Sequence, residues 1–323
     1  MNAKYIYWEL SNYCNLQCKQ CFAKATYNDS TIVDWDMLIH AIDNVANANS
    51  NATVIRFGGG EPMLIPYLYD LVKYCSQKKI AVDITSNGLL IDEKAIEALS
   101  LSGLRELTIS VDGLEQTHEY MRGANTYRRL WRNIDRIVST AKFQVSMGFT
   151  VTSVNYHEME AFVDTAYHAG IRKFYFFRYC GDNHKSLFEM NAHQLCSASK
   201  AIDRLSNRYK DARFNREASS FFSFLVGGCA CGEGCNFING ILTVNYRGDV
   251  VVCAAIDKVL GNIYTDSLEE LWNRIKKERA AMREMPAACS GCDYHKTCHG
   301  GCKSASYNQY NNYSNKDPLC FMR

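Results

Sequence analysis

Hydrophobic and polar residues alternate along the first two thirds of the chain in two kinds of segment. Short apolar runs, typical of buried strands, occur at residues 5–10, 53–57, 80–85, 104–110, 143–151 and 173–178. Between and after them, apolar residues recur with helical spacing at about residues 34–45, 68–74, 93–99, 127–140, 157–168 and 191–207. The pattern therefore predicts six strand–helix units in strict alternation.

This alternation predicts an α/β fold whose parallel strands are joined by right-handed helical crossovers. A partial (β/α) barrel and an open doubly wound sheet both satisfy it. In either architecture, functional residues gather at the carboxyl ends of the strands. Most of the predicted strands run directly into polar or glycine-rich segments. One rim of the sheet is therefore the expected functional site.

The pattern changes after about residue 215. Residues 227–320 are rich in Gly, Cys, Asn and Tyr, with one predicted hairpin, 241–245 against 249–253, and one amphipathic helix, 268–282. Residues 306–315 are predicted to form a loop. This is little apolar periodicity for a conventional core, so we expect two domains, 1–215 and 216–323, the second stabilised by bound metal.

Composition narrows the function classes. The net charge of the 323 residues is +2, which favours neither nucleic acid nor an anionic membrane as partner. The longest apolar run, 221–226, is far too short to cross a bilayer, and the N-terminus lacks a signal-peptide layout. These features predict a cytoplasmic protein. In the reducing cytosol, clusters among its 15 cysteines are expected to bind metal rather than to form disulfides.

Cys14, Cys18 and Cys21 follow the first predicted strand with the spacing C-x3-C-x2-C. Three thiolates leave one iron of a [4Fe–4S] cluster open, whereas a structural zinc site would need a distant fourth ligand. The spacing and its position resemble the radical SAM superfamily. The resemblance implies a partial (β/α)6 barrel similar to part of a TIM barrel. It also implies that S-adenosylmethionine binds the open iron and is cleaved to a 5′-deoxyadenosyl radical.

The segment Gly58-Gly59-Gly60-Glu61-Pro62 matches the glycine-rich motif of that superfamily. Glycines let the backbone approach a ligand closely. The resemblance implies that this segment, including Glu61, holds the amino group of the methionine moiety. A plain turn is the alternative for such a sequence taken by itself.

Further contacts with S-adenosylmethionine are implied at other strand ends. Arg122 or Arg178 is a candidate partner of the methionine carboxylate, since a guanidinium suits that geometry. The superfamily usually has an aromatic residue before the third cysteine, where this chain has Gln20, so the residue that packs on adenine stays open. The full set of predicted cofactor contacts is Phe22, Gly59, Gly60, Glu61, Pro62, Ser86, Asn87, Ser110, Asp112, Arg122 and Arg178.

A second cysteine array resembles the SPASM domain, which binds auxiliary [4Fe–4S] clusters in many radical SAM enzymes. Its order is Cys235, Gly248 and Cys253, then C-x2-C-x5-C-x3-C from Cys289, and finally Cys320. Two closed clusters need an eighth thiolate, from Cys229 or, as the alternative, Cys231. The family pattern implies one cluster on Cys229, Cys235, Cys253 and Cys302, and another on Cys289, Cys292, Cys298 and Cys320. Zinc is the alternative metal for the C-x2-C pair.

The resemblance implies three [4Fe–4S] clusters in all, S-adenosylmethionine as cosubstrate, and a reductase such as flavodoxin or ferredoxin as electron donor. It also implies a peptide or protein substrate, modified by a crosslink, a thioether or another altered residue. Because Cys14 lies close to the start, we expect leader recognition to need a separate leader-binding protein, or none.

Several alternatives remain open. Oxidation of a small molecule or of a haem precursor is the main one. Sulfatase maturation is disfavoured because Ala254 stands where those enzymes have a catalytic Asp after the cysteine. A non-catalytic iron–sulfur electron carrier would leave the glycine-rich motif without a purpose. Cys180, after the sixth strand, is either a hydrogen donor to a substrate radical or a buried structural thiol.

Overall fold

The computed structural model describes residues 5–29, 31–48, 53–179, 187–215, 237–238, 240–253 and 255–321. Its contacts divide the chain into two compact units. The first comprises Met1–Val111, His118–Met147 and Gly240–Ile275, and the second Asp112–Thr117, Gly148–Asn239 and Lys276–Arg323. Cys180, Cys229, Cys231, Cys235 and Ala254 lie outside the described residues.

The first unit contains the alternating strands and helices that the sequence predicts. Its strands are β1 (Tyr5–Glu9), β2 (Val54–Gly58), β3 (Ala81–Ser86), β4 (Glu106–Ser110), β8 (Ile241–Val244), β9 (Asp249–Cys253) and β10 (Ile256–Asn262). Its helices are α1 (Trp35–Ala48), α2 (Leu68–Gln77), α3 (Glu93–Ser102) and α5 (Tyr127–Thr140). The boundary between the units falls within α4 (Glu115–Arg122), β5 (Gln144–Val151) and α9 (Leu268–Arg283).

The second unit contains the remaining elements. They are α6 (Met159–His168), β6 (Lys173–Arg178), α7 (Ala192–Arg208), β7 (Arg213–Asn215), α10 (His295–Cys298) and α11 (Lys303–Tyr310). Strand β7 pairs parallel to β6, a pairing that the sequence pattern did not predict. Short 3-10 turns lie at Pro62–Leu64, Tyr156–Glu158 and Ala287–Cys289.

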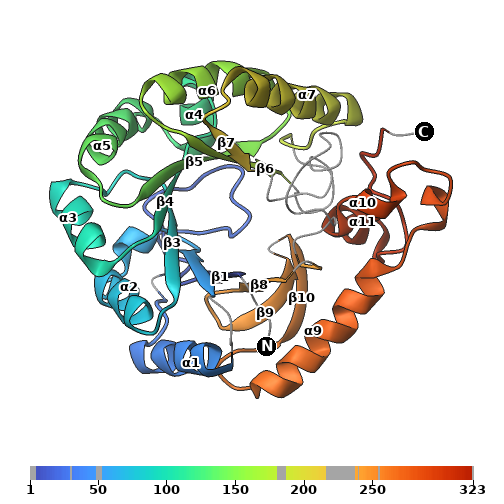
Figure 1. Ribbon diagram of the computed structural model, residues 1–323, viewed down its shortest axis with the longest axis horizontal. Coiled ribbons are helices and arrows are strands. Elements are labelled where there is room, and N and C mark those ends of the chain that lie inside the picture. Colours follow the sequence, from blue (N-terminus) through green and yellow to red (C-terminus); the bar gives the residue numbers. More distant parts are fainter. Residues whose placement is uncertain are drawn as a thin grey trace. The chain divides into compact units, whose positions relative to one another are not determined.

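The predicted parallel sheet is confirmed. In the first unit, β1 pairs parallel to β2, β2 to β3 and β3 to β4, and Figure 1 shows these strands side by side with α1, α2 and α3 along their outer side. The predicted hairpin is also confirmed, because β8 and β9 pair antiparallel. Strand β8 in addition pairs parallel to β1, with Tyr5 opposite Ile241. The hairpin thus extends the sheet beyond the strand that leads to Cys14.

Local sequence explains where the helices begin and end. Asp92 caps α3, since its side chain accepts a hydrogen bond from the Ala95 backbone N–H at 2.9 Å. The same helix ends at Gly103, which adopts the left-handed conformation with a φ of 86°.

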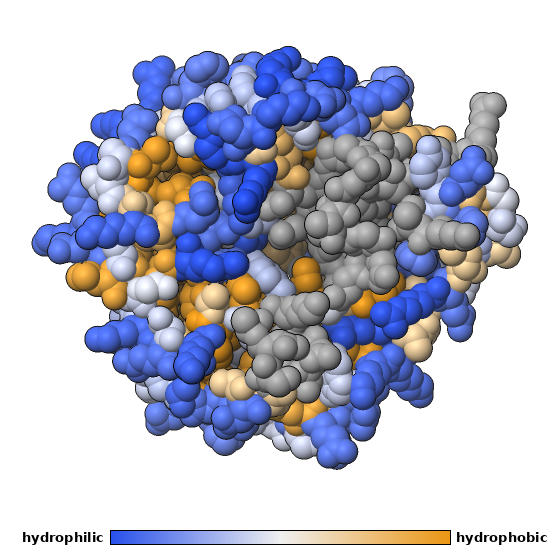
Figure 2. All heavy atoms as spheres, in the orientation of Figure 1, coloured by the Kyte–Doolittle hydropathy of each residue, from blue (hydrophilic) through white to orange (hydrophobic). Residues whose placement is uncertain are grey.

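In Figure 2, hydrophilic atoms predominate along the edge where α2, α3 and α5 lie. No helix in the described part of the chain combines the length and apolar character needed to cross a bilayer.

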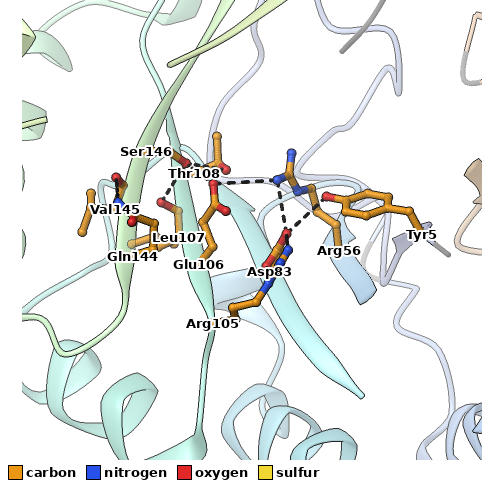
Figure 3. Close-up of polar contacts among 10 residues, drawn as sticks. All are labelled: Tyr5, Arg56, Asp83, Arg105, Glu106, Leu107, Thr108, Gln144, Val145 and Ser146. Carbon is orange, nitrogen blue, oxygen red and sulfur yellow. Dashed lines mark hydrogen bonds and ion pairs between the residues drawn. The ribbon is translucent and has the colours of Figure 1, made fainter. Parts of the chain in front are cut away.

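A group of charges around the buried Asp83 ties the strands of the first unit together (Figure 3). The Asp83 carboxylate accepts hydrogen bonds from Arg105 at 2.8 and 2.6 Å, from Arg56 at 3.3 Å and from the Tyr5 hydroxyl at 3.3 Å. Arg56 also lies 3.9 Å from a Glu106 carboxylate oxygen. Buried charges persist only when they are paired, so this group favours one register of β1 to β4.

One sequence prediction is wrong in its first half. Residues 306–315 were expected to form a loop, but α11 covers Lys303–Tyr310, and only the stretch from Asn311, which is left-handed with a φ of 56°, to Asn315 lies outside a helix. The buried positions of α11 are Lys303, Ser304, Ala305 and Ser306, mostly polar residues. A helix that buries polar residues has no apolar stripe, and periodicity therefore misses it.

Candidate functional site

The loop after β1 holds three cysteines on one short, anchored segment. The Cys14 backbone N–H donates to the Thr26 carbonyl at 3.3 Å, and the Cys21 N–H donates to the Cys18 carbonyl at 3.1 Å. Midway, the Lys19 N–H donates to the Met121 carbonyl at 2.9 Å. These bonds hold Cys14, Cys18 and Cys21 on a single segment beyond the end of β1.

The chemistry of these donors suits an iron–sulfur cluster better than a single ion. Within the described ranges, no three His, Cys, Asp or Glu side chains converge closely enough to chelate one metal ion. A cubane cluster makes no such demand, because each thiolate binds a different iron. Burial raises the pKa of the Cys14 thiol to about 12, and negative charge on Cys18 and Cys21 adds to the shift. A positively charged centre would reverse this shift.

The glycine-rich segment after β2 packs directly against the chain that leads into Cys14. The Gly60 N–H donates to the Ser11 carbonyl at 2.8 Å, and the Glu61 N–H donates to the Tyr13 carbonyl at 2.8 Å. A Cβ on Gly60 would lie 1.9 Å from the Tyr13 carbonyl oxygen. Only glycine permits this contact, which fixes the start of the cysteine loop.

Glu61 joins this segment to the end of β3. Its buried carboxylate accepts hydrogen bonds from the Ser86 hydroxyl at 2.7 Å, the Asn87 N–H at 2.8 Å and the Met63 N–H at 3.1 Å. Burial raises the pKa of Glu61, while these bonds and the nearby Arg122 oppose the shift. Because a carboxylate has about four acceptor positions, it retains capacity for one more donor, such as an ammonium group.

Asn87 links the same rim to the cysteine loop. Its side-chain amide donates to the Asn15 side-chain oxygen at 2.8 Å and lies 4.0 Å from the Cys14 sulfur. Asn87 is also held by its backbone bond to Glu61. Predicted contacts on β2 and β3 therefore meet beside Cys14 in the first unit.

The other predicted cofactor contacts of the first unit lie less close to the group formed by Cys14, Glu61 and Asn87. Ser110 ends β4 and is half-buried, and Arg122 ends α4 within electrostatic range of Glu61. Phe22 is 50% exposed, whereas Gln20 is 6% exposed. An exposed aromatic ring beside the cysteines is able to pack on a planar group, so Phe22 stays a predicted cofactor contact.

Two predicted contacts, Asp112 and Arg178, belong to the second unit. An Asp112 carboxylate oxygen accepts a hydrogen bond from the Thr150 N–H at 2.7 Å. The buried Arg178 guanidinium forms a two-point ion pair with Asp317, at 2.5 and 3.1 Å. The Arg178 guanidinium already has a carboxylate partner, which makes Arg122 the better candidate of the two for the methionine carboxylate.

Four cysteines of the second array line one small hollow in the second unit. They are Cys289, Cys292, Cys298 and Cys320, the set that the SPASM resemblance assigns to one auxiliary cluster. Burial raises the pKa of the Cys298 thiol to about 12, and negative charge on Cys320 adds to the shift. Four interacting thiols around one hollow are a suitable donor set for a closed [4Fe–4S] cluster.

The remaining array cysteines fall elsewhere. Cys302 does not line this hollow, and its sulfur lies 3.0 Å from the Ser304 hydroxyl. Cys253 ends β9 in the first unit. Their predicted partners Cys229 and Cys235 are outside the described residues, so the other auxiliary cluster stays a prediction.

Sequence reasoning missed Tyr7 and Glu9, which lie beneath the glycine-rich segment. The Tyr7 hydroxyl accepts a hydrogen bond from the Gly59 N–H at 3.3 Å, and a Cβ on Gly58 would lie 2.6 Å from it. Burial raises the pKa of Tyr7 above its ordinary range and that of Glu9 to about 7. Tyr7 and Glu9 are two positions apart on β1, so their side chains point to the same face of the sheet. Polar side chains at alternate positions of the strand before the cysteines could therefore have identified them from the sequence.

Comparisons with known proteins agree with this geometry. The family model of the radical SAM superfamily matches residues 8–166, and the model of the SPASM iron–sulfur cluster-binding domain matches residues 235–293. The chain is 24% identical to an AdoMet-dependent heme synthase of Nitratidesulfovibrio vulgaris, an alignment that covers 98% of this chain and 92% of that protein. It is 25% identical to the mycofactocin maturase MftC of Mycobacterium ulcerans, over 97% of this chain and 86% of that protein.

Solved structures share the fold. Streptococcus suis SuiB bound to S-adenosylmethionine superimposes with a TM-score of 0.80 at 18% identity, covering 98% of this chain and 77% of that one. Native anSMEcpe with bound AdoMet gives a TM-score of 0.80 at 19% identity, covering 98% and 94%. SuiB bound to its precursor peptide SuiA gives a TM-score of 0.79 at 18% identity, covering 98% and 76%.

Proposed function

Because this chain belongs to the radical SAM superfamily and carries a SPASM iron–sulfur domain, we propose that it modifies a peptide by abstracting hydrogen from it. When bound, a reduced [4Fe–4S] cluster with S-adenosylmethionine on its open iron supplies a 5′-deoxyadenosyl radical. The observation that carries the proposal is the meeting of the cysteine loop, Glu61 and Asn87 at one rim.

Each group at this rim has a distinct task. Cys14, Cys18 and Cys21 provide three thiolates and leave the fourth position to the cosubstrate. Gly60 lets the chain before Cys14 pack against the second strand end. The buried Glu61 carboxylate accepts the methionine ammonium, and Arg122 balances the charge of the carboxylates nearby.

A peptide substrate is supported by two relatives. The mycofactocin maturase is similar across 97% of this chain, and the SuiB fold accommodates a precursor peptide in a solved complex. A maturase of this kind forms a crosslink or a thioether in a ribosomally made precursor. A separate leader-binding protein is the proposed partner for substrate recognition.

Auxiliary clusters complete the redox chemistry in this proposal. Hydrogen abstraction leaves a substrate radical, and an oxidised product requires the loss of one more electron. Cys289, Cys292, Cys298 and Cys320 would hold one of two auxiliary clusters with full thiolate ligation, which would supply an acceptor for that electron while the substrate releases a proton. A flavodoxin or ferredoxin would be the reductase of the catalytic cluster. Cys180 is the alternative, a hydrogen donor that would return hydrogen to the substrate radical without net oxidation.

A second candidate function is oxidation of a haem precursor. It is favoured by the AdoMet-dependent heme synthases of Nitratidesulfovibrio vulgaris and Methanosarcina barkeri, each 24% identical over 98% of this chain. The two candidates share the cleavage of S-adenosylmethionine and differ in the group that loses hydrogen.

One anaerobic experiment separates them. The reconstituted protein is incubated with S-adenosylmethionine and reductant, together with either a peptide encoded beside its gene or an iron porphyrin precursor. We expect 5′-deoxyadenosine and a peptide lighter by two hydrogens. A porphyrin product with an unchanged peptide would establish the second candidate. The absence of 5′-deoxyadenosine under all conditions would favour an electron carrier.

A further inference from the structure

The first unit has a hollow of about 450 Å³ between α5 and the segment that joins β3 to α3. Arg129, Arg132 and Arg136 line it from α5, and residues 89–91 line it from the joining segment. We call it the arginine groove. It is separate from the cysteine loop and from the second cysteine array, and none of the roles proposed above uses it.

The groove is positively charged. Arg132 and Arg136 are exposed, and neither has an ion-pair partner among the residues that the structure describes. The lining includes one carboxylate, Asp92, which is engaged as the cap of α3 through a 2.9 Å bond from Ala95. Three guanidinium groups around one hollow repel one another, so an anion that enters it gains favourable interactions with all three.

The spacing of the arginines indicates the kind of anion. Positions 129, 132 and 136 lie on one face of α5, and the outer two are about 10 Å apart along the helix axis. This separation exceeds the span of a single carboxylate or phosphate. The opposite wall contributes one partly exposed apolar side chain, Leu90, since Leu89 and Ile91 are buried. A polypeptide segment with several carboxylates and an apolar residue matches both walls.

The groove is connected to the proposed catalytic rim. The Arg129 guanidinium donates to the Leu89 carbonyl at 3.0 Å, and the Asn133 amide donates to the Gly88 carbonyl at 2.9 Å. The joining segment begins immediately after Asn87, the residue beside the Cys14 sulfur. A peptide bound in the groove therefore lies against the segment that also shapes the catalytic rim.

We propose that the arginine groove binds an acidic segment of the peptide substrate. The inference rests on the proposed function, since it names the part of the substrate recognised and its chemistry. The separation of the charges, with the partly exposed Leu90 opposite them, favours a peptide over a small anion. Nucleic acid is the competing polyanion, and the test includes it.

The test measures binding to the holoprotein without turnover. The probe is a short fluorescein-labelled peptide of alternating Glu and Leu, followed by anisotropy at physiological ionic strength. We expect the double variant Arg132→Glu/Arg136→Glu to bind about tenfold more weakly or worse, because attraction becomes repulsion. The matched control, Lys73→Glu/Lys277→Glu, has the same change in net charge at exposed positions on α2 and α9 and should bind normally.

Equal weakening in both double variants would reveal a general charge effect and overturn the proposal. So would unchanged binding by the groove variant, or tighter binding of a single-stranded oligonucleotide of equal charge that depends on the same arginines. The milder pair Arg132→Gln/Arg136→Gln repeats the test if the charge reversal impairs folding. Because no turnover is needed, a protein that binds the probe but modifies no peptide would count against the proposed function alone.

Discussion

At Gly60 a single missing side chain determines where the cysteine loop begins. We predict that Gly60→Ala lowers both iron bound by the catalytic site and 5′-deoxyadenosine formation, the latter by about tenfold or more, because its Cβ would overlap the Tyr13 carbonyl at 1.9 Å. Iron analysis and product chromatography measure the two effects. Leu101→Ala, at a position that is 77% exposed on α3, is the control. Equal losses in both variants would contradict this explanation.

Glu9 makes stability depend on pH. Burial raises its pKa from 4.5 to about 7, so the folded protein holds a proton that the unfolded chain releases above about pH 4.5. The corresponding stability is fully present below that pH and is lost as the pH rises through about 7, by at most about 3 kcal/mol. We predict that Glu9→Gln flattens this part of the profile of melting temperature against pH. An unchanged slope between pH 4.5 and 7 would show that Glu9 is not its source.

At the scale of elements, Asp317 links the end of β6 to the second cysteine array. Besides its ion pair with Arg178, its carboxylate accepts the Cys302 N–H at 2.9 Å and the Leu319 N–H at 2.8 Å. The Asp317 N–H donates to the Gly300 carbonyl at 2.8 Å, and its carbonyl accepts the Cys320 N–H at 2.9 Å. One buried residue thus holds both the turn between Cys298 and Cys302 and the chain at Cys320.

We predict that Asp317→Asn lowers auxiliary iron while sparing the catalytic site. The change leaves the Arg178 charge buried without its carboxylate, which costs about 3 to 5 kcal/mol, and weakens the side-chain bonds to the Cys302 and Leu319 N–H groups. Iron content and the spectrum of the reduced protein measure the loss. Tyr313→Phe, which removes one 2.7 Å bond to Glu278 in the same unit, is the control and should retain its iron. Retention of full iron by Asp317→Asn would rule out this positioning role.

The elements show what sequence could and could not predict. Periodicity identified the six strands and the hairpin, because each buries an apolar face in a regular repeat. The rule on strand ends anticipated that Glu61 and Asn87 would approach Cys14. The partner of Arg178 was not predictable, since Asp317 lies 139 positions away and a local pattern carries no information on such a contact. The pairing of β8 with β1 was missed for the same reason.

At the scale of the whole molecule, the proposed function gives the two cysteine arrays different chemistry. The first would leave one coordination position open, and the second would close its irons with thiolates. The described contacts around the Cys14 loop and around the hollow lined by Cys289 and Cys298 each stay within one unit: Glu61 and Asn87 support the loop, whereas Asp317 supports the hollow. Each site should therefore assemble without the other, and that independence can be measured by counting iron.

Three [4Fe–4S] clusters predict about twelve irons per chain after anaerobic reconstitution. Replacing Cys14, Cys18 and Cys21 together by Ala should leave about eight irons and abolish 5′-deoxyadenosine formation, because no open iron remains. Replacing Cys289 and Cys292 by Ala should also leave about eight, yet retain cleavage of S-adenosylmethionine while blocking product formation. Zinc analysis of the same samples tests the alternative metal for the C-x2-C pair. If the unsubstituted protein binds about eight irons and no zinc after reconstitution, only one auxiliary cluster forms. If either cysteine variant loses all of its iron, the two arrays assemble as one.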